Sequence, residues 1–370
     1  MRKQIKVLQV GLSDHVGGIE KVVDSWYKRL PSDIHFDFTN TSVRKLAFEQ
    51  TFTEGGSKIY RIPSRKADPG GSYRALKYIL SGGGYDYLQF HAMSLSWPEP
   101  ILIAGRSKRT QGIIHSHMVV DRHMAVKYRL MHAVGKRCLS NVEYHEVACG
   151  TDAGKSMFGN DLFTVIPNGI ELGRFRFCEG KRKEIRKKYH ISDSTYVIGH
   201  VGRPGAQKNY PFIFRTFFEL LKNGCDCRLL LIGNIERDPQ IQGLMNQYSC
   251  KQAVAFTGYV EETSAYYSAM DCFFFPSLYE GFSVSLIEAQ ASGLPCIVSG
   301  NLSSESKICG DFSFVSLRSV TAAAEELIKY SKIKKDRKES PIELSFDIQN
   351  TANKMFDYYR EHRKQSDRWQ

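Results

Sequence analysis

Residues 272–298 constrain the fold of this chain more than any other segment. They begin with the apolar run 272–275 and end with a second apolar run, 296–298, and both runs are typical of strands buried on two faces of a sheet. Between them lie a glycine turn at Gly281, a helical stretch and a second glycine turn at Gly293. Strand, helix and strand in this order predict a βαβ unit with two parallel strands.

The start of the predicted helix, about residues 283–286, is expected to bind an anion. The first N–H groups of a helix have no partner within it, and the helix dipole is positive at this end. Glu280 and Glu288 flank this position. Because carboxylates repel a phosphate, we expect both to accept hydrogen bonds from hydroxyl groups on either side of it. A nucleotide sugar has this layout of ribose diol, two phosphates and sugar hydroxyls.

Glu288 is either a solvent-facing helical carboxylate or a buried one. Its neighbours Leu286, Ile287, Ala289 and Ala291 make the helix largely apolar. A carboxylate buried in such a helix needs polar partners.

Apolar strand runs alternate with amphipathic stretches along the whole chain, which predicts an α/β protein with parallel sheets. A basic, glycine-containing stretch at 171–192 is expected to link two domains, 1–175 and 176–345. The expected strands are 5–10, 86–90, 111–115, 146–149, 163–166, 195–201, 228–232 and 253–257. The expected helices are 18–30, 71–81, 97–106, 122–139, 151–158, 210–222, 239–248, 262–269 and 346–363.

Composition narrows the class of protein. Hydrophobic residues make up 42% and charged residues 24% of 370 residues, as in soluble globular proteins. No apolar run is long enough for a transmembrane helix, and residues 5–10 are interrupted by Lys6 and Gln9, so a strand is expected there and no signal peptide. The nine cysteines include one isolated C-x-C pair, so we expect reduced thiols and a cytoplasmic location.

The formal net charge of +12 predicts an anionic partner, which is a nucleic acid, an anionic lipid or a phosphorylated substrate. No nucleic-acid-binding motif accompanies the charge, so nucleic acid is not expected. Arg203 and Lys208 follow a predicted strand, at the end where open parallel sheets bind ligands. Both are interpreted as ligands of a diphosphate, although two surface cations in a polar loop remain an alternative.

Five short motifs occur in order within residues 5–300. They are Gly17-Gly18, Ile166-Pro167-Asn168-Gly169-Ile170, Val201-Gly202-Arg203 with Lys208-Asn209, Phe256-Thr257-Gly258-Tyr259-Val260, and Glu280-Gly281-Phe282-Ser283 with Glu288-Ala289 before Gly293-Leu294-Pro295. Together they resemble the motifs of the retaining glycosyltransferases of family 4. That resemblance implies the GT-B fold, with two Rossmann-like, doubly wound domains facing a central cleft and a last helix, about 346–370, that packs back on the first domain.

The resemblance also implies an activity. The enzyme would move a hexose from a nucleoside-diphosphate sugar, expected to be a UDP-sugar, to a glycan or lipid-linked acceptor, with retention and without a metal or other cofactor. Bacterial members of this kind often build surface polysaccharides, so the inner face of the cell membrane is an expected location. The N-terminal domain would bind the acceptor and the C-terminal domain the donor.

Residue roles follow from the same resemblance. Glu280 would contact the transferred sugar, Glu288 the ribose, and Arg203 and Lys208 the departing diphosphate. Donor-binding positions would include Gly17, Gly18, Gly233, Gly258, Tyr259, Val260, Phe282, Ser283, Val284 and Ser285.

His115 and His117 share one face of a predicted strand, and Asp121 follows them. This pattern raises the question of a metal site, but a third ligand at matched spacing is missing, so no metal is expected. The resemblance implies that a histidine here lies beside the anomeric carbon of the sugar. His117 fits that place best and His115 second.

The segment 122–137 combines cations with apolar residues at mostly helical spacing. Such a helix either packs on its own domain or lies at an anionic membrane surface. Its cations are Arg122, Lys127, Arg129, Lys136 and Arg137, and its apolar residues include Met124, Tyr128, Met131 and Val134.

Three other functions remain open from the sequence. A GT-B sugar-nucleotide epimerase would release product without an acceptor. A metal-dependent hydrolase using His115 and His117 would lose activity with a chelator. A catalytically silent nucleotide-sugar-binding module would bind the donor and transfer nothing.

Overall fold

The computed structural model describes residues 4–120, 124–333, 337 and 342–364. The chain forms two compact units, in which unit 1 comprises Met1–Gly169 and Asp347–Gln370, and unit 2 comprises Ile170–Phe346. The sequence placed these boundaries at 175/176 and 345/346.

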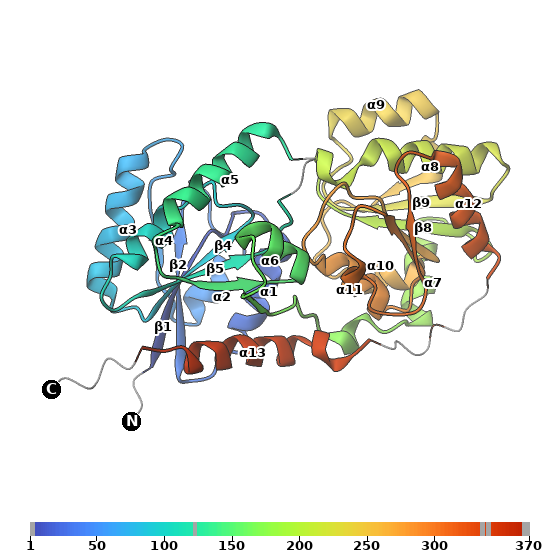
Figure 1. The fold of residues 1–370 in the computed structure, drawn as a ribbon. Helices are drawn as coiled ribbons and strands as arrows, with labels where there is room; N and C mark the ends of the chain where they lie inside the picture. The colour runs from blue at the N-terminus through green and yellow to red at the C-terminus, as the bar shows by residue number, and fades with distance from the viewer. Residues whose placement is uncertain (1–3, 121–123, 334–336, 338–341, 365–370) are drawn as a thin grey trace. The chain divides into compact units, whose positions relative to one another are not determined.

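Unit 1 is built on a parallel sheet in the order β3-β2-β1-β4-β5-β6-β7 (Figure 1). The strands are β1 (Ile5–Val10), β2 (Ile34–Asn40), β3 (Ile59–Arg61), β4 (Tyr87–Ala92), β5 (Gln111–Ser116), β6 (His145–Ala148) and β7 (Thr164–Val165). Strands β2 and β3 are absent from the elements expected from the sequence.

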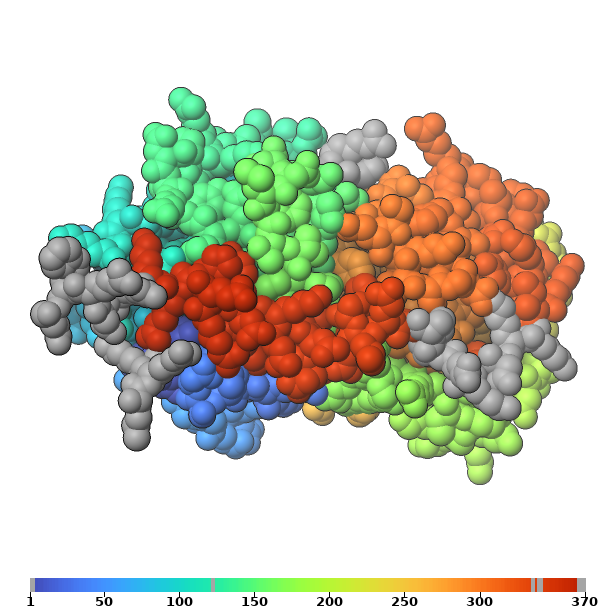
Figure 2. All heavy atoms as spheres, turned by 60° about the horizontal axis from the view of Figure 1, so that its bottom comes forward, coloured from blue at the N-terminus to red at the C-terminus, as the bar shows by residue number. Residues whose placement is uncertain are grey.

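The helices of unit 1 lie between these strands, except α13, which returns from the end of the chain. They are α1 (Gly18–Tyr27), α2 (Glu49–Glu54), α3 (Pro69–Gly83), α4 (Glu99–Gly105), α5 (Val126–Leu139), α6 (Thr151–Phe158) and α13 (Ile348–Glu361). The Asp347 side chain caps α13 by accepting from the backbone N–H of Gln349. Helix α13, red in Figure 2, packs on α1 beside the blue N-terminal residues.

The two faces of the unit 1 sheet differ in chemistry. Leu8, Leu88 and Ile114 point to an apolar core shared with helices α3, α4 and α6. Because side chains alternate along a strand, Gln9, Gln89, His91, His115 and His117 gather on the opposite face. That face is covered by α1 and α13. Trp26 of α1 stacks on His115, and the Tyr359 hydroxyl of α13 donates to Gln89. A polar layer therefore lies buried inside unit 1.

Unit 2 is built on a second parallel sheet, in the order β10-β9-β8-β11-β12-β13. The strands are β8 (Tyr196–Val201), β9 (Cys227–Ile232), β10 (Val254–Phe256), β11 (Cys272–Phe275), β12 (Cys296–Ser299) and β13 (Phe312–Val315). Its α-helices are α7 (Glu179–Lys188), α8 (Tyr210–Lys222), α9 (Pro239–Tyr248), α10 (Ser264–Ala269), α11 (Val284–Ala291) and α12 (Val320–Ser331). The described residues of this unit also form the short 3₁₀ helices η1 (Leu172–Phe175), η2 (Ala206–Lys208), η3 (Lys251–Ala253), η4 (Ser304–Ser306) and η5 (Leu344–Phe346).

The segment 171–192, expected to be a linker, instead folds as part of unit 2. Its helix α7 places the buried Arg186 against Asp271, with 2.6 Å between the guanidinium and the carboxylate. Arg186 also donates to the carbonyls of Ala269 and Thr195. The sequence suggested a linker because this stretch is highly charged and the carboxylate that pairs with Arg186 lies far away in the sequence, at Asp271.

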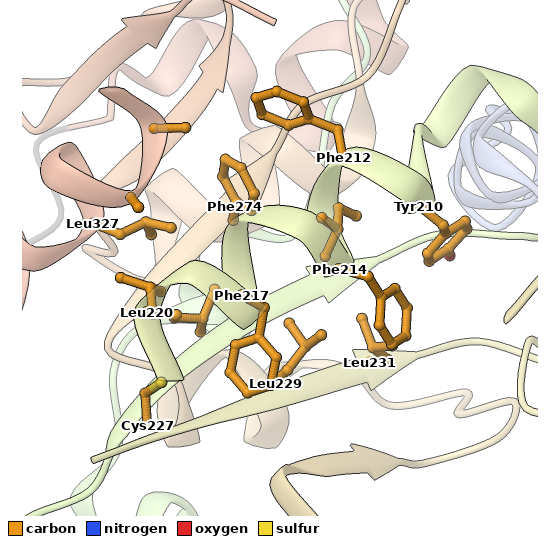
Figure 3. Close-up of a cluster of buried hydrophobic side chains, with 14 of the residues drawn as sticks. Tyr210, Phe212, Phe214, Phe217, Leu220, Cys227, Leu229, Leu231, Phe274 and Leu327 are labelled. Carbon is orange, nitrogen blue, oxygen red and sulfur yellow. The ribbon is translucent and has the colours of Figure 1, made fainter. Parts of the chain in front are cut away.

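Helix α8 supplies much of the unit 2 core. Its phenylalanines Phe212, Phe214 and Phe217 point into a cluster with Leu229 of β9 and Phe274 of β11 (Figure 3). All of β11 is buried, so the prediction of a strand covered on both faces is confirmed. This packing fixes β8 and β11 side by side beneath the loops that follow them.

In each sheet the first strands are added toward one edge, and the chain then returns to the other side of the first strand and adds the later strands toward the opposite edge. The reversal lies between β1 and β4 in unit 1 and between β8 and β11 in unit 2. Loops diverge at such switch points and leave a crevice at the carboxyl ends of the strands, where ligands bind. The prediction of two Rossmann-like, doubly wound sheets is confirmed.

Candidate functional site

Two loops meet at the switch point of unit 2. The loop after β8 carries Gln207, which accepts from the backbone N–H of Leu278 at 2.8 Å and donates through its side chain to the Tyr279 carbonyl at 3.0 Å. Asn209 donates to the carbonyl of Pro276 at 3.2 Å. These bonds fix the β8 loop and the β11 loop to one another, so the side chains that they carry have defined positions.

Lys208 and Glu280, both expected in the site, are brought together by these loops. The Lys208 Nζ lies 2.8 Å from the Glu280 Oε1, with the two side chains only 15% and 10% exposed. The same ammonium lies 4.4 Å from the ring centroid of Phe275, the last residue of β11. Because little water screens this pair, the attraction between the two charges is stronger than at an exposed surface.

Arg203, the other expected cation, is exposed. Within the described residues, no hydrogen bond or ion pair holds its guanidinium. The structure therefore does not join Arg203 to the Lys208–Glu280 pair, and its guanidinium is available to a ligand.

Helix α11 begins at Val284, and Ser283 is its N-cap residue. The Leu286 N–H, expected to be free, instead donates to the Ser283 carbonyl at 3.1 Å, because the first turn is tight. Among the described residues, the N–H groups of Val284 and Ser285 at this end have no hydrogen-bond partner. Phe282 is buried and stacks on Phe346, with ring centroids 5.5 Å apart, so its side chain anchors the turn.

Glu288 is buried, as its apolar surroundings indicated, with 3% of its surface exposed. The Tyr267 hydroxyl of α10 donates to its Oε2 at 2.8 Å. Burial, together with the Glu288 charge, raises the pKa of Tyr267 well above its ordinary value, so this hydroxyl stays protonated as a donor. Sequence reasoning missed Tyr267, since nothing in residues 262–269 shows which tyrosine faces Glu288.

Replacing Glu288 by Gln should weaken UDP binding, because a neutral amide accepts a weaker hydrogen bond from a ribose diol than a carboxylate does. The expected loss is the difference between a hydrogen bond to a charged acceptor and one to a neutral acceptor, about 1–1.5 kcal/mol, or roughly tenfold in affinity. Titration calorimetry with UDP measures it, and Glu325→Gln on the exposed side of α12 is the control. An unchanged UDP affinity in a folded Glu288→Gln protein would contradict the ribose assignment.

The other glycines of the predicted donor site lie in the adjoining loops of unit 2. The Gly233 N–H donates to the Gly258 carbonyl at 3.0 Å, which joins the loops after β9 and β10. Gly233 has φ +137°, and a Cβ added there would lie 2.2 Å from the Gly202 carbonyl oxygen, so only glycine fits. Tyr259 is half exposed and Val260 half buried beside these glycines.

In unit 1, Gly17 caps α1 in an extended conformation and Gly18 is its first residue. Glu20 reaches back from this turn and accepts from the Ser13 N–H at 3.0 Å and the Ser13 hydroxyl at 2.9 Å. Since Gly17 has no positive φ, its backbone does not require glycine.

Three buried histidines lie at the carboxyl ends of strands β4 and β5 in unit 1. The rings of His115 and His117 are tilted against one another, with centroids 4.1 Å apart. His91 of β4 joins them, and its Nδ1 lies 2.9 Å from the His117 Nε2. Burial lowers the pKa of His117 to about 3 and the pKa values of His91 and His115 well below the ordinary value, with a smaller contribution from the neighbouring imidazoles at His91 and His115. All three rings are therefore neutral at physiological pH.

The sequence pattern lacked a third ligand for a metal site at His115 and His117, and the structure supplies one, His91. One nitrogen from each of the three rings lies within 4.8 Å of the others, close enough to hold a transition metal. Sequence spacing missed His91 because it pairs with His115 across two strands. Asp121, the other expected ligand, lies outside the described residues. Within them, carboxylates are absent from this cluster, so a bound divalent ion would gain no anionic ligand from it.

Comparison with known proteins agrees with the fold and the class of enzyme. Residues 181–341 match the family model described as glycosyl transferases group 1. The chain is 27% identical to the putative glycosyltransferase EpsF of Bacillus subtilis, over 96% of both chains. It is 24% identical to the Escherichia coli UDP-Gal:alpha-D-GlcNAc-diphosphoundecaprenol alpha-1,3-galactosyltransferase, over 80% of this chain and 79% of that one.

Among solved structures, HepE of Anabaena in complex with UDP and glucose is similar in fold. The TM-score is 0.77 at 12% identity, and the match covers 96% of this chain and all of that one. The structural neighbours are GT-B glycosyltransferases, and the GT-B fold expected from the sequence is confirmed. Together the sequence matches and the fold support a GT-B glycosyltransferase.

Proposed function

We propose that this protein transfers a hexose from a UDP-sugar to a glycan or lipid-linked acceptor, with retention of anomeric configuration, as a family 4 glycosyltransferase of polysaccharide biosynthesis. The observation that carries the proposal is the switch point of unit 2, where the loops after β8 and β11 carry Lys208 and Glu280, and helix α11 contributes Glu288 and its own start. These groups match a diphosphate, a sugar, a ribose and a phosphate in turn.

In the proposed mechanism, binding of the donor separates the Lys208–Glu280 pair. Lys208, helped by Arg203, neutralises the diphosphate as it leaves, and Glu280 takes the hydroxyls of the transferred sugar. Such a clamp stabilises charge that develops in the transition state and needs no metal ion. Unit 1 binds the acceptor and supplies His117, the proposed neighbour of the anomeric carbon.

The relatives support the choice of substrates. UDP is named in the galactosyltransferase and in the HepE complex, and a diphosphoundecaprenol acceptor is named in the former. Neither the epimerase nor the hydrolase reading is favoured by these matches.

Thermal unfolding with a panel of nucleoside-diphosphate sugars tests the donor, because a ligand that binds the native state raises the melting temperature. A UDP-sugar should give the largest rise, and UDP should be released only with an acceptor present. EDTA should leave transfer unchanged, whereas the hydrolase alternative predicts its loss. If no nucleoside-diphosphate sugar stabilises the protein, the proposal fails.

Helix α5 bears on where the acceptor is met. Its apolar side chains Val126, Leu130 and Val134 are 63–65% exposed, and Tyr128 and Met131 are exposed as well. The helix is instead held through buried His132, which accepts from the Leu95 N–H at 3.1 Å, and through Gly135, where a Cβ would meet the Leu95 carbonyl. Helix α5 therefore packs on unit 1 through His132, Gly135 and Leu139, and its apolar residues Val126, Leu130 and Val134 are left exposed.

We accordingly propose that α5 rests on an anionic membrane surface at the inner face of the cell membrane. Lys127, Arg129, Lys136 and Arg137 accompany its exposed apolar residues. Within the described residues, every helix is too short or too polar to cross a bilayer. Contact through α5 would bring unit 1 to a lipid-linked acceptor.

Replacing both Lys127 and Arg129 by Gln should weaken binding to vesicles that contain anionic lipid. Each cation contributes about 1 kcal/mol, so the double variant should bind roughly thirtyfold more weakly, and salt should weaken the wild type likewise. Co-sedimentation measures this, with Lys183 and Lys187 of α7 changed to Gln as the control. Binding that ignores lipid charge, or equal loss in the control, would contradict a role for α5.

A further inference from the structure

A row of hydrogen bonds crosses the buried polar face of unit 1, from α13 to His117. The Tyr359 hydroxyl donates to the Gln89 Oε1, and the Gln9 Nε2 donates to the Tyr359 hydroxyl oxygen at 3.5 Å. The Gln9 Oε1 lies 2.8 Å from the His91 Nε2, and the His91 Nδ1 lies 2.9 Å from the His117 Nε2. All five side chains are buried, so each bond is shielded from competing water.

The chemistry of these groups determines where each proton lies. The Gln9 Oε1 is a carbonyl oxygen and only accepts, so the His91 Nε2 carries a proton. A neutral imidazole holds one proton, so the His91 Nδ1 bears a lone pair and accepts from the His117 Nε2–H. The Nδ1 of His117 then bears a lone pair as well.

We infer that Gln9, His91 and Tyr359 are positioning residues, which hold His117 in its Nε2–H tautomer with the Nδ1 lone pair ready to accept a substrate hydroxyl. Within the described residues, the His117 Nδ1 has no hydrogen-bond partner. An unsatisfied buried acceptor is unfavourable, so a hydroxyl that reaches it is bound preferentially. The nature of that hydroxyl rests on the proposed function, but the tautomer does not.

The inference gives α13 a chemical task in addition to its packing. Tyr359 is the residue of α13 that joins the row, since it donates to the Gln89 Oε1 and accepts from the Gln9 Nε2. The neighbouring Tyr87 is equally buried, but its hydroxyl donates to the Tyr359 main-chain carbonyl at 2.9 Å, outside the row. Tyr87→Phe is therefore a matched control for Tyr359→Phe, since each removes one buried hydroxyl.

Nitrogen-15 NMR of the histidine side chains tests the tautomer directly on the full-length protein. The His117 signals, assigned by their loss in His117→Gln, should show a protonated Nε2 and an unprotonated Nδ1 in the wild type. In Gln9→Leu, the His91 proton loses its acceptor, and the His117 signals should move toward the other tautomer. A protonated Nδ1 in the wild type, or an unchanged His117 in a folded Gln9→Leu protein, would overturn the inference.

Kinetics then show whether the tautomer matters to transfer. Tyr359→Phe should lower kcat about tenfold at unchanged donor KM, less than the roughly 10²–10⁴-fold that a positioned acid–base side chain itself contributes, because Tyr359 acts only through His117. Tyr87→Phe should stay within about twofold of the wild type. Equal effects of the two variants would reduce Tyr359 to a packing residue. If the protein transfers no sugar at all, the NMR result still decides the tautomer separately.

Discussion

Replacing Lys208 by Met should lower turnover by about 10²–10³-fold at saturating donor and acceptor, the typical cost of removing one preorganised group that stabilises developing charge. Met keeps an unbranched side chain beside the Phe275 ring but removes the ammonium. The loss should appear mainly in kcat, because the diphosphate gains charge as it departs. A steady-state assay of UDP release measures it, with Lys222→Met on the exposed side of α8 as the control.

Lys208→Met also leaves the carboxylate of Glu280 shielded from water without its partner, so the substitution lowers the stability of the protein as well as its turnover. Breaking a buried pair costs about 3–5 kcal/mol, and this partly exposed pair should cost less. The double variant Lys208→Met, Glu280→Gln removes both charges and should regain stability without regaining activity. A Lys208→Met protein that turns over at the wild-type rate would remove Lys208 from the site.

Replacing Glu280 by Gln should change binding and catalysis in opposite directions. Its carboxylate holds the Lys208 ammonium at 2.8 Å and thus competes with a diphosphate for it. Without that charge, UDP should bind roughly tenfold more tightly, a gain of about 1.4 kcal/mol. Transfer should nevertheless fall by about 10²-fold or more, because the sugar hydroxyls lose a charged acceptor close to the reacting carbon.

Calorimetry with UDP and an assay with the UDP-sugar separate these two effects of Glu280→Gln. UDP lacks the sugar and reports only the competition for Lys208. Weaker UDP binding in the variant would show that Glu280 supports the diphosphate site and does not compete with it. Unchanged transfer would remove Glu280 from contact with the sugar.

The positions of Glu280 and of the start of α11 were predictable because their order in the sequence matches their order in space. Strand β11, the turn at Gly281 and helix α11 follow one another, so Glu280 and the helix start had to be neighbours. The proximity of Lys208 was less certain, since it depends on β8 lying beside β11. That adjacency is set by the order of strands, which periodicity does not encode.

The buried polar layer of unit 1 was not predictable in the same way. His91 reaches the two later histidines only through the register of β4 against β5, and Tyr359 reaches Gln89 only through the docking of α13. Tyr267 is a similar case in unit 2, since its role appears only when α10 packs beside α11. Pairs across elements need tertiary structure, whereas pairs along one element need only spacing.

Strand β2 and helix α7 were not predicted, because polar or charged residues within each of them are also typical of exposed loops. Strand β2 alternates Ile34, Phe36 and Phe38 with polar residues, but His35 and Asp37 between them suit an exposed loop equally well. In the structure these two bind one another at 2.9 Å. Helix α7 was hidden by its basic composition, because most of its cations face solvent and only Arg186 is deeply buried.

Titration of UDP into the full-length protein in the presence of EDTA tests whether the loops after β8 and β11 bind a nucleoside diphosphate without a metal. We expect one UDP bound per chain, with affinity reduced by Lys208→Met and by Glu288→Gln and retained in Lys222→Met. Absence of UDP binding, or binding that is indifferent to both site substitutions, would contradict it.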